Sequence, residues 1–466
     1  MNPIQSSRPT VRFGACRRAA FALAALTLSV GSAYAAAFDQ APAKDFGGRV
    51  MASGLVVPGE EATITGRGFQ PGQRVTLSYG GEKLNDSPYV VDDKGGFEAK
   101  VAVPKSAAAA RYGIAVEVAN PPAATTFDLK VSPVVPLSGA DRYTVQSEKL
   151  VPGVYQSDYS AKTGKLFATS AVGRPPVTQS QLVKIDPQTL KVEAAITPAQ
   201  VPGRDDNRVY AVYGVGVDDE NGNVWVTNTR DSTVAVYSQA DLSLVKQFDA
   251  DAVPHSRDVV VVPGVHKAYV SSPMQDEISV FDTAKLAALP GIEVKSGKRG
   301  EKFGPMSLAL DAQNGKLYTV AMNTAEIAVI DVKTDTLEKV IPVPGAVSGA
   351  GIAVDPKSQR AFVAAQGTDN VVVVDLSDGR VLADTPVGAG ALNVTFDPVK
   401  NLVYAANRGA GTVTVLDTDG KIVANLDGGT FPNHVSVDGK GNAYLLNKSR
   451  GSDDPKGDRI SRITAK

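Results

Sequence analysis

NVWVTNTRDSTVAVY, residues 223–237, is the stretch that decides the fold of this chain. It contains two short runs in which apolar side chains stand at every second position, and a polar turn separates them. Alternation with a period of two is typical of a half-buried strand, so the stretch predicts a β-hairpin. The same pattern recurs in residues 267–282, 316–331, 360–375 and 402–417. Such recurrence indicates a radial repeat.

The repeat has a regular length. Aligning one aromatic residue from each hairpin gives seven copies, separated by 58, 44, 49, 44, 42 and 40 residues. Each copy holds four β runs, and four antiparallel strands in about 40 to 45 residues make one blade of a β-propeller. The sequence therefore predicts a seven-bladed propeller over residues 140–466. The aligned aromatic residues, which we expect in the core, are Phe167, Trp225, Tyr269, Tyr318, Phe362, Tyr404 and Tyr444.

The seventh copy is incomplete, because the chain ends after its third β run. The run Tyr143-Thr144-Val145-Gln146 stands before the first copy and has no partner of its own. We expect it to supply the missing fourth strand, which would close the ring and remove two exposed sheet edges.

These repeats resemble the YVTN-repeat family of seven-bladed β-propellers. Trp225-Val226-Thr227-Asn228 is the nearest copy of the motif, and Tyr404-Ala405-Ala406-Asn407 and Tyr444-Leu445-Leu446-Asn447 are looser ones. The resemblance implies an exported or cell-surface binding protein, and it extends to lactonase-type and quinoprotein-associated propellers. A shared fold does not supply the activity.

The first 35 residues have the composition of a secretory signal peptide. They carry four arginines and no acidic residue, then an apolar run at residues 19–30 and small residues before a cleavage site at Ala35. We therefore expect a periplasmic, secreted or cell-surface protein without a membrane span. Cys16 is the only cysteine and lies in this segment, which excludes disulfides and thiol chemistry from the mature chain. Subtracting the four arginines leaves 44 basic and 49 acidic residues, a balance of −5 that does not favour non-specific binding to DNA.

A second, smaller domain is expected before the propeller. Residues 36–48 are interpreted as a flexible leader, residues 49–133 as a β-sandwich of short alternating runs, and residues 134–139 as a linker stiffened by proline. The corner Gly66-Arg67-Gly68-Phe69-Gln70-Pro71-Gly72 resembles the GxGFxPG corner of immunoglobulin-like modules, which implies a spacer or adhesion module. The predicted fold class is all-β, a seven-bladed β-propeller preceded by a small immunoglobulin-like β-sandwich.

Cations and amides are predicted to gather at one mouth of the propeller channel. In a blade, the loops before the first strand and after the second lie on the same face, here called the top face, and these loops vary most between copies. Arginine forks and amide groups match carboxylate, phosphate or sugar oxygens, so the ligand is expected to be a small anionic or polyhydroxylated molecule or a protein partner. The candidate ligand-binding residues are Arg230, Arg408, His255, Arg257, His434, Asn228, Asn407, Asn447 and Lys448.

Several of these residues also have a structural interpretation. An asparagine that ends a second strand most often caps its own turn, which applies to Asn228, Asn407 and Asn447. His255 and His434 are not interpreted as a pair of metal ligands, because no group of glutamates lies beside them. The two residues least explained by folding are Arg230 and Arg408, and they are the first choice for ligand contact.

The function predicted from the sequence is that of a non-enzymatic exported binding protein, a monomer with no cofactor and no metal. The chain has no GxSxG, HExxH or P-loop motif. Two alternatives stay open. One is a lactonase-like metal-dependent hydrolase, for which Asp205, Asp206, Asp258 and Glu301 are scattered candidate ligands. The other is a nucleic-acid-binding propeller, which requires the top-face cations to cluster.

Overall fold

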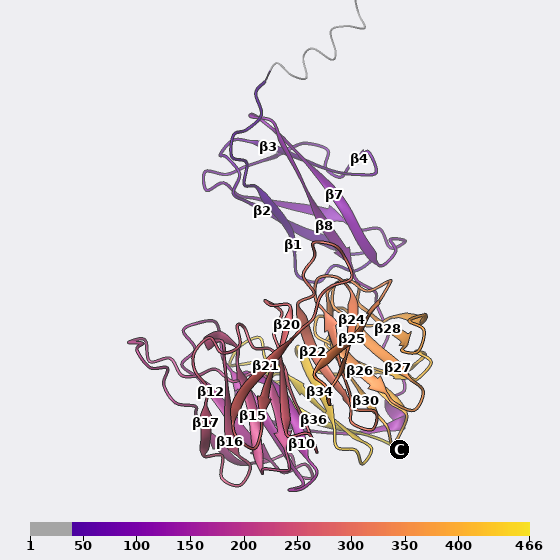
Figure 1. The fold of residues 1–466 in the computed structure, drawn as a ribbon. Coiled ribbons are helices and arrows are strands. Elements are labelled where there is room, and N and C mark those ends of the chain that lie inside the picture. The colour runs from indigo at the N-terminus through magenta and orange to yellow at the C-terminus, as the bar shows by residue number, and fades with distance from the viewer. Residues whose placement is uncertain (1–39) are drawn as a thin grey trace, which may run out of the picture. The chain divides into compact units, whose positions relative to one another are not determined.

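The computed structural model describes residues 40–466, and this part of the chain is almost entirely β-structure (Figure 1). The signal peptide predicted at residues 1–35 lies outside the described residues. Among the residues described, no helix is both long and apolar enough to cross a membrane. The chain divides into two compact units, a small one formed mainly by Thr63–Val101 and Gly113–Asp128 and a large one formed mainly by Leu129–Lys466.

The N-terminal part of the described chain folds into two sheets. One has the order β1-β2-β6, and in the other β4, β3, β7 and β8 follow one another while β5 also pairs with β3. Its assignment to the immunoglobulin-like class, and the boundaries at residues 49–133 and 134–139, stay predictions. The strands are β1 (Arg49–Ser53), β2 (Glu61–Arg67), β3 (Arg74–Tyr79), β4 (Glu82–Lys83), β5 (Tyr89–Val90), β6 (Phe97–Ala102), β7 (Ala110–Ala119) and β8 (Ala123–Val131).

The glycine-rich corner of this part buries Phe69, which is 6% exposed and meets the ring of Phe97 edge-on with 5.3 Å between centres. Gly68 has a φ of 76°, a left-handed conformation that L side chains rarely adopt. A Cβ on Gly66 would lie 2.0 Å from the Phe97 ring. Gly66 is therefore explained by close packing against Phe97, and Gly68 by its left-handed backbone conformation.

The rest of the described chain forms seven four-stranded antiparallel sheets, as expected for a seven-bladed propeller. Two short 3₁₀ helices accompany them, η2 (Ala140–Arg142) and η3 (Thr229–Asp231). The sheets are, in order, β10 (Val154–Ser160), β11 (Lys165–Ala171), β12 (Ser180–Ile185) and β13 (Val192–Ile196); β14 (Val215–Asp218), β15 (Asn223–Asn228), β16 (Thr233–Ser238) and β17 (Leu244–Gln247); β18 (Val259–Val262), β19 (Lys267–Ser271), β20 (Glu277–Asp282) and β21 (Ala287–Glu293); β22 (Pro305–Asp311), β23 (Lys316–Ala321), β24 (Glu326–Asp331) and β25 (Thr336–Pro342); β26 (Gly349–Asp355), β27 (Arg360–Ala365), β28 (Asn370–Asp375) and β29 (Val381–Pro386); β30 (Ala391–Asp397), β31 (Leu402–Asn407), β32 (Thr412–Asp417) and β33 (Ile422–Asp427); and β34 (Pro432–Val437), β35 (Asn442–Asn447), β36 (Arg459–Ala465) and β9 (Tyr143–Lys149).

The core of the propeller lies between successive sheets. Trp225 of β15 is fully buried, with its ring 5.7 Å from that of Phe248 and 5.8 Å from that of Phe281 in the next blade. All seven aligned aromatic residues are at least 96% buried. The inner strands are buried on both faces, as in β15, where all six residues are buried, because both faces of each sheet meet a neighbouring blade. The alternation around Trp225 predicted strands buried on one face only.

The strand β9 is the fourth strand of the last sheet. It pairs with β36 over its whole length, from Arg459 opposite Lys149 to Ala465 opposite Tyr143. Between this sheet and the first one, Tyr444 and Leu446 pack with Leu166 in one apolar cluster. The first and seventh blades are therefore held together by the same kind of core as every other neighbouring pair.

The aspartates that follow the third strands cap their own turns. The carboxylate of Asp331 accepts the backbone N–H groups of Lys333 and Thr334, each at 2.9 Å. Asp186 does the same in the first blade, where the N–H of Thr189 is the main cause that lowers its pKa to about 2. The loops at this end of the channel, opposite the top face, are thus committed to closing hairpins.

Candidate functional site

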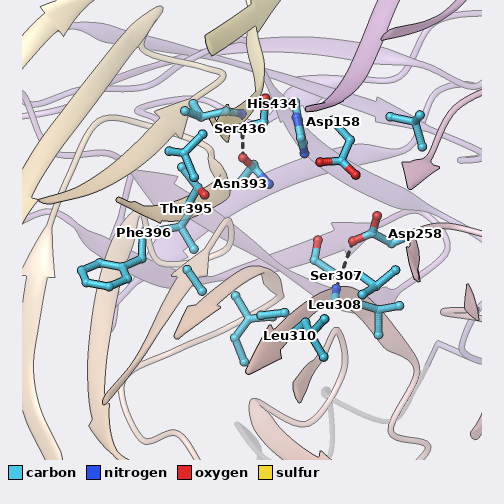
Figure 2. Close-up of a pocket in the computed structure, with 18 of the residues that line it drawn as sticks. Asp158, Asp258, Ser307, Leu308, Leu310, Asn393, Thr395, Phe396, His434 and Ser436 are labelled. Carbon is cyan, nitrogen blue, oxygen red and sulfur yellow. Dashed lines mark hydrogen bonds between the residues drawn. The ribbon is translucent and has the colours of Figure 1, made fainter. Parts of the chain in front are cut away.

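A cavity of about 370 Å³ occupies the centre of the ring and is lined by residues at the first strands of all seven sheets. Figure 2 shows the side chains of Asp158, His434 and Asp258 facing the same space between the strands. The cavity is thus the channel of the propeller, and its wall carries acidic and imidazole groups next to valine and leucine.

The polar side chains of this channel link neighbouring blades. Four of them each accept a backbone N–H from another blade, so each of the four has a structural use. The accepted contacts are Val217 N–H to Asp158 Oδ2 at 2.8 Å, Leu308 N–H to Asp258 Oδ2 at 3.0 Å, Val435 N–H to Asn393 Oδ1 at 2.8 Å and Ser157 N–H to His434 Nδ1 at 3.3 Å.

Burial changes the protonation of these groups. It raises the pKa of Asp158 to about 6, and the nearby Asp258 carboxylate adds to the rise. Burial also raises the pKa of Asp258, against the attraction of Arg257. For His434, burial and then Arg257 lower the pKa to about 3. His434 is therefore a neutral imidazole whose Nδ1 accepts a hydrogen bond, which leaves its proton on Nε2.

Above the channel, the charged groups of arginine and lysine side chains lie over tyrosine and phenylalanine rings. The Arg257 guanidinium lies 5.4 Å from the centre of the Tyr155 ring, and the Lys448 ammonium lies 4.8 Å from the same ring. Tyr155 meets Tyr213 edge-on at 4.9 Å, and the guanidinium of Arg230 lies 5.9 Å from the Tyr213 ring. These distances are those of cation–π contacts.

A second aromatic ring extends this group. Phe431 contacts two guanidinium groups, that of Arg408 at 5.0 Å and that of Arg450 at 5.3 Å. Arg408 also donates to the side-chain oxygen of Asn433 at 2.6 Å, and Asn433 donates to the carbonyl oxygen of Tyr155 at 2.7 Å. We call the whole group the cation–aromatic cluster: Tyr155, Tyr213, Arg230, Arg257, Arg408, Phe431, Lys448 and Arg450.

The cations of the cluster lack acidic partners. Within residues 40–466, none of its four arginines and one lysine forms a salt bridge. Nη1 of Arg257 is buried and has no hydrogen-bond partner in this part of the chain. Burial and then Arg408 lower the pKa of Lys448 to about 8, and burial lowers the pKa of Arg408 itself. The cluster therefore holds five cations, none of which is in salt-bridge contact with a carboxylate among the described residues.

The structure brings five of the nine candidate residues to the top face close to one another. Arg230, Arg257, Arg408 and Lys448 belong to the cluster, and His255 is close enough to Arg230 and Arg257 that, after burial, their charges lower its pKa. His434 lies lower, in the channel wall.

The three candidate asparagines are directed into their own blades. Asn228, Asn407 and Asn447 are at most 2% exposed. The amide of Asn407 donates to Thr412 and Thr414, that of Asn447 to the carbonyl oxygens of Thr430 and Lys456, and that of Asn228 to Gln247. Their donors are thus used within the fold.

Sequence reasoning did not select Tyr155, Tyr213 and Arg450. Tyr155 lies in β10 and Tyr213 lies two residues before β14, so both stand where a first strand begins. The strand registers place Arg257, Met306, Ala350, Leu392 and Asn433 at the corresponding position of the other five blades. The signal that could have identified the two tyrosines was an aromatic residue at the start of a first strand, which lies at the mouth of the channel.

Neither the cluster nor the rest of the described chain offers a metal centre. Among residues 40–466, no three His, Cys, Asp or Glu side chains come together in a way that could hold a metal ion. Asp206, one of the scattered acidic candidates, pairs with Arg208 at 2.5 Å.

Comparison with known proteins supports the fold. No family model matches the chain. The chain is similar to the uncharacterized protein YncE of Salmonella typhimurium strain LT2, with 26% identity over 299 residues, 62% of this chain and 81% of that protein. It is similar to YncE of Escherichia coli K12 to the same degree, 26% over 304 residues, with 62% and 81% covered.

Solved propellers show the same architecture at low identity. A chain of hydrazine synthase from Kuenenia stuttgartiensis matches with a TM-score of 0.53 and 17% identity, over 64% of this chain and 93% of that one. Virginiamycin B lyase from Staphylococcus aureus matches with a TM-score of 0.53 and 13% identity, over 69% of this chain and 99% of that one. At these identities the likeness shows the fold alone.

Proposed function

We propose that the protein is a non-enzymatic binding protein that recognises an anionic ligand with the cation–aromatic cluster at the top of its channel. The observation that carries this proposal is the set of four arginines and one lysine held around Tyr155, Tyr213 and Phe431 without a salt bridge among the described residues. In keeping with the signal peptide expected at residues 1–35, we place this activity in the periplasm or outside the cell, in a monomer.

The energetics of the cluster favour an anion. Like charges held close together repel, and removal from water strengthens that repulsion. Burial is the main cause that lowers the pKa of Lys448, and the second cause is repulsion by Arg408. A carboxylate, sulfate or phosphate group would relieve it and would accept hydrogen bonds from the fork of Arg257, whose Nη1 has no partner among residues 40–466.

Single-stranded nucleic acid is a second candidate ligand. The interleaving of tyrosine rings with arginines favours it, since bases stack on aromatic side chains while cations follow the phosphates. The balance of −5 outside residues 1–35 does not favour it, but the local clustering of cations matters more to a bound strand than the total charge. No particular observation in residues 40–466 supports the hydrolase alternative.

Calorimetric titration with inorganic pyrophosphate and with a single-stranded oligonucleotide tests both candidates. The variant R230Q/R408Q removes one cation from each side of the cluster. A hydrogen bond to a charged group contributes about 1.5 to 3 kcal/mol, so we expect each substitution to weaken binding roughly tenfold or more. A log–log plot of affinity against salt that is much steeper for the oligonucleotide than for pyrophosphate would identify nucleic acid as the ligand class.

The matched control is K285Q/R380Q. It removes the same charge from exposed side chains in turns after third strands, at the opposite end of the channel. Because Arg408 also holds Asn433, the variant R408K serves as a second check that keeps the charge. Equal affinities of wild type, R230Q/R408Q and the control for every anion tested would rule out the cluster as the binding site.

A further inference from the structure

Two lysines of this chain lie over tyrosine rings in opposite environments. Lys448, just after β35, is partly buried with its ammonium 4.8 Å from the centre of the Tyr155 ring. Lys440, in the turn before β35, is exposed with its ammonium 5.2 Å from the Tyr159 ring. The two lysines therefore form a matched pair for comparison. Each contacts its own tyrosine ring, but one ammonium group is partly buried and the other is exposed.

The two ammonium groups have different neighbours. Lys440 Nζ donates to the hydroxyl oxygen of Tyr159 at 2.8 Å, and this bond raises its pKa. For Lys448, no hydrogen bond or salt bridge of Nζ is found among residues 40–466, while its backbone N–H is fixed by the carbonyl oxygen of Phe431 at 3.0 Å. The charged groups that face Lys448 are Arg408 and Arg257 from other blades, Arg450 from its own loop, and the buried Asp458.

This environment favours the neutral amine. Burial and Arg408 lower the pKa of Lys448 to about 8, with Asp458 opposing them. A lysine that is desolvated beside another cation is a nucleophile near neutral pH, because a useful fraction of it carries a free electron pair. Arginines around it would at the same time hold an anionic group of an incoming molecule.

We propose that Lys448 is a carbonyl-reactive amine that forms a reversible imine with aldehydes or ketones bearing a carboxylate or phosphate group. This inference rests on the proposed function, because Arg408 and Arg257 of the cluster supply the anion contacts. It goes further in that it names the chemical class of the ligand and assigns it a covalent step.

The step balances without any further reactant. The electron pair of neutral Nζ attacks the carbonyl carbon, and one Nζ proton passes to the carbonyl oxygen to give the neutral carbinolamine. The oxygen then leaves as water with the second Nζ proton, and the nitrogen electron pair closes the C=N bond of the imine. Water reverses the reaction, so ligand exchange needs neither an oxidant nor a reductant.

Trapping with pyridoxal 5′-phosphate tests the proposal, since this probe carries both an aldehyde and a phosphate. The full chain is treated with less than one equivalent, the imine is reduced with borohydride, and labelled peptides are identified by mass spectrometry. The pKa of Lys448 is lowered to about 8 and that of Lys440 is raised from its usual 10.5, so at neutral pH the fraction of free amine is far larger at Lys448. The lower basicity of Lys448 offsets this advantage in part. We therefore expect labelling of Lys448 to exceed that of Lys440 by about tenfold or more.

Two comparisons separate this proposal from the proposed function. Pyridoxine 5′-phosphate has the phosphate but no aldehyde, so it should bind without labelling and should protect Lys448. The variant K448R, which keeps the positive charge, should lose the label, while K440R, outside the cluster, should leave both labelling and non-covalent binding unchanged. Binding of pyridoxine 5′-phosphate with no preference for Lys448 in the labelling would overturn the imine alone. Absence of any binding of pyridoxine 5′-phosphate would count against the anion site itself.

Discussion

The carboxyl group of Asp158 should make the protein lose stability as the pH rises from about 4 to 6. Its pKa rises from the usual 3.8 to about 6 in the folded protein, first because it is enclosed by the blades. Between these two values the folded state holds a proton that the unfolded state has released. Folding stability therefore falls with increasing pH in this window and stays level above it.

The size of the effect follows from the shift. One pKa unit corresponds to about 1.4 kcal/mol, so a rise of about two units makes the ionised group cost about 3 kcal/mol in the folded state. Asp158 lines the channel and is partly accessible to water there, so this value is an upper limit. Asp258, whose pKa is also raised by burial, adds a second contribution of the same sign.

The assay is urea denaturation of wild type and D158N between pH 4 and pH 8. Asparagine does not titrate, and it loses one of the two backbone N–H contacts of Asp158, from Val217 and Tyr159, which lowers stability by a constant amount. The informative quantity is thus the change with pH in the difference between the two proteins. We expect D158N to gain up to about 3 kcal/mol relative to wild type from pH 4 to pH 7.

The control is D186N, because the pKa of Asp186 is lowered to about 2 by hydrogen bonds in its turn. For this residue stability is lost as the pH falls below about 4, so its profile should match that of wild type above pH 5. A difference between D158N and wild type that does not change from pH 4 to pH 7 would refute the low-dielectric channel inferred for Asp158.

Three further predictions concern the scaffold. Deleting residues 141–149 removes β9 and leaves β36 as an open edge, so the melting temperature should fall, and an unchanged melting curve would contradict the closure by β9. Trp225→Ala should lower the free energy of unfolding by about 3 to 5 kcal/mol in denaturant titrations, since the ring is fully buried between two blades. Gly214→Ala places a Cβ 2.7 Å from the carbonyl oxygen of Arg257, so it should lower the free energy of unfolding by about 1 to 3 kcal/mol. Gly222 lies in an open turn with a positive φ, so Gly222→Ala should disturb only its own loop.

The fold could be predicted because the sequence shows two regular spacings, one between apolar residues within a strand and one between successive blades. Alternating apolar residues around Trp225 specify strands, and the spacing from Trp225 to Tyr269 and onward specifies blades. The near-continuous apolar runs of the inner strands, such as Asn370–Asp375, have a further cause, which is that each sheet buries its two faces against neighbouring blades. The unpaired run at Tyr143 could be assigned by counting, since the last copy lacked a strand.

The candidate site could be predicted only in part. The topology of a blade assigns Arg230, Arg257, Arg408 and Lys448 to one face, and the structure has them close together. Which side chains of a first strand face the channel depends on local register. In β10 a bulge between Val154 and Ser157 shifts that register, so the alternation alone does not reveal that Asp158 lines the cavity.

The pairing of β9 with β36 also sets the order in which this protein can be completed. Arg459 contacts Ser147 across 312 residues of sequence, so β9 is synthesised early but has no partner strand until almost the whole chain has been made. Earlier blades are built from contiguous segments and can form one by one, whereas closure is the slow, long-range step. If residues 1–35 act as the predicted signal peptide and the chain is exported unfolded, the blades and their closure by β9 form only after export.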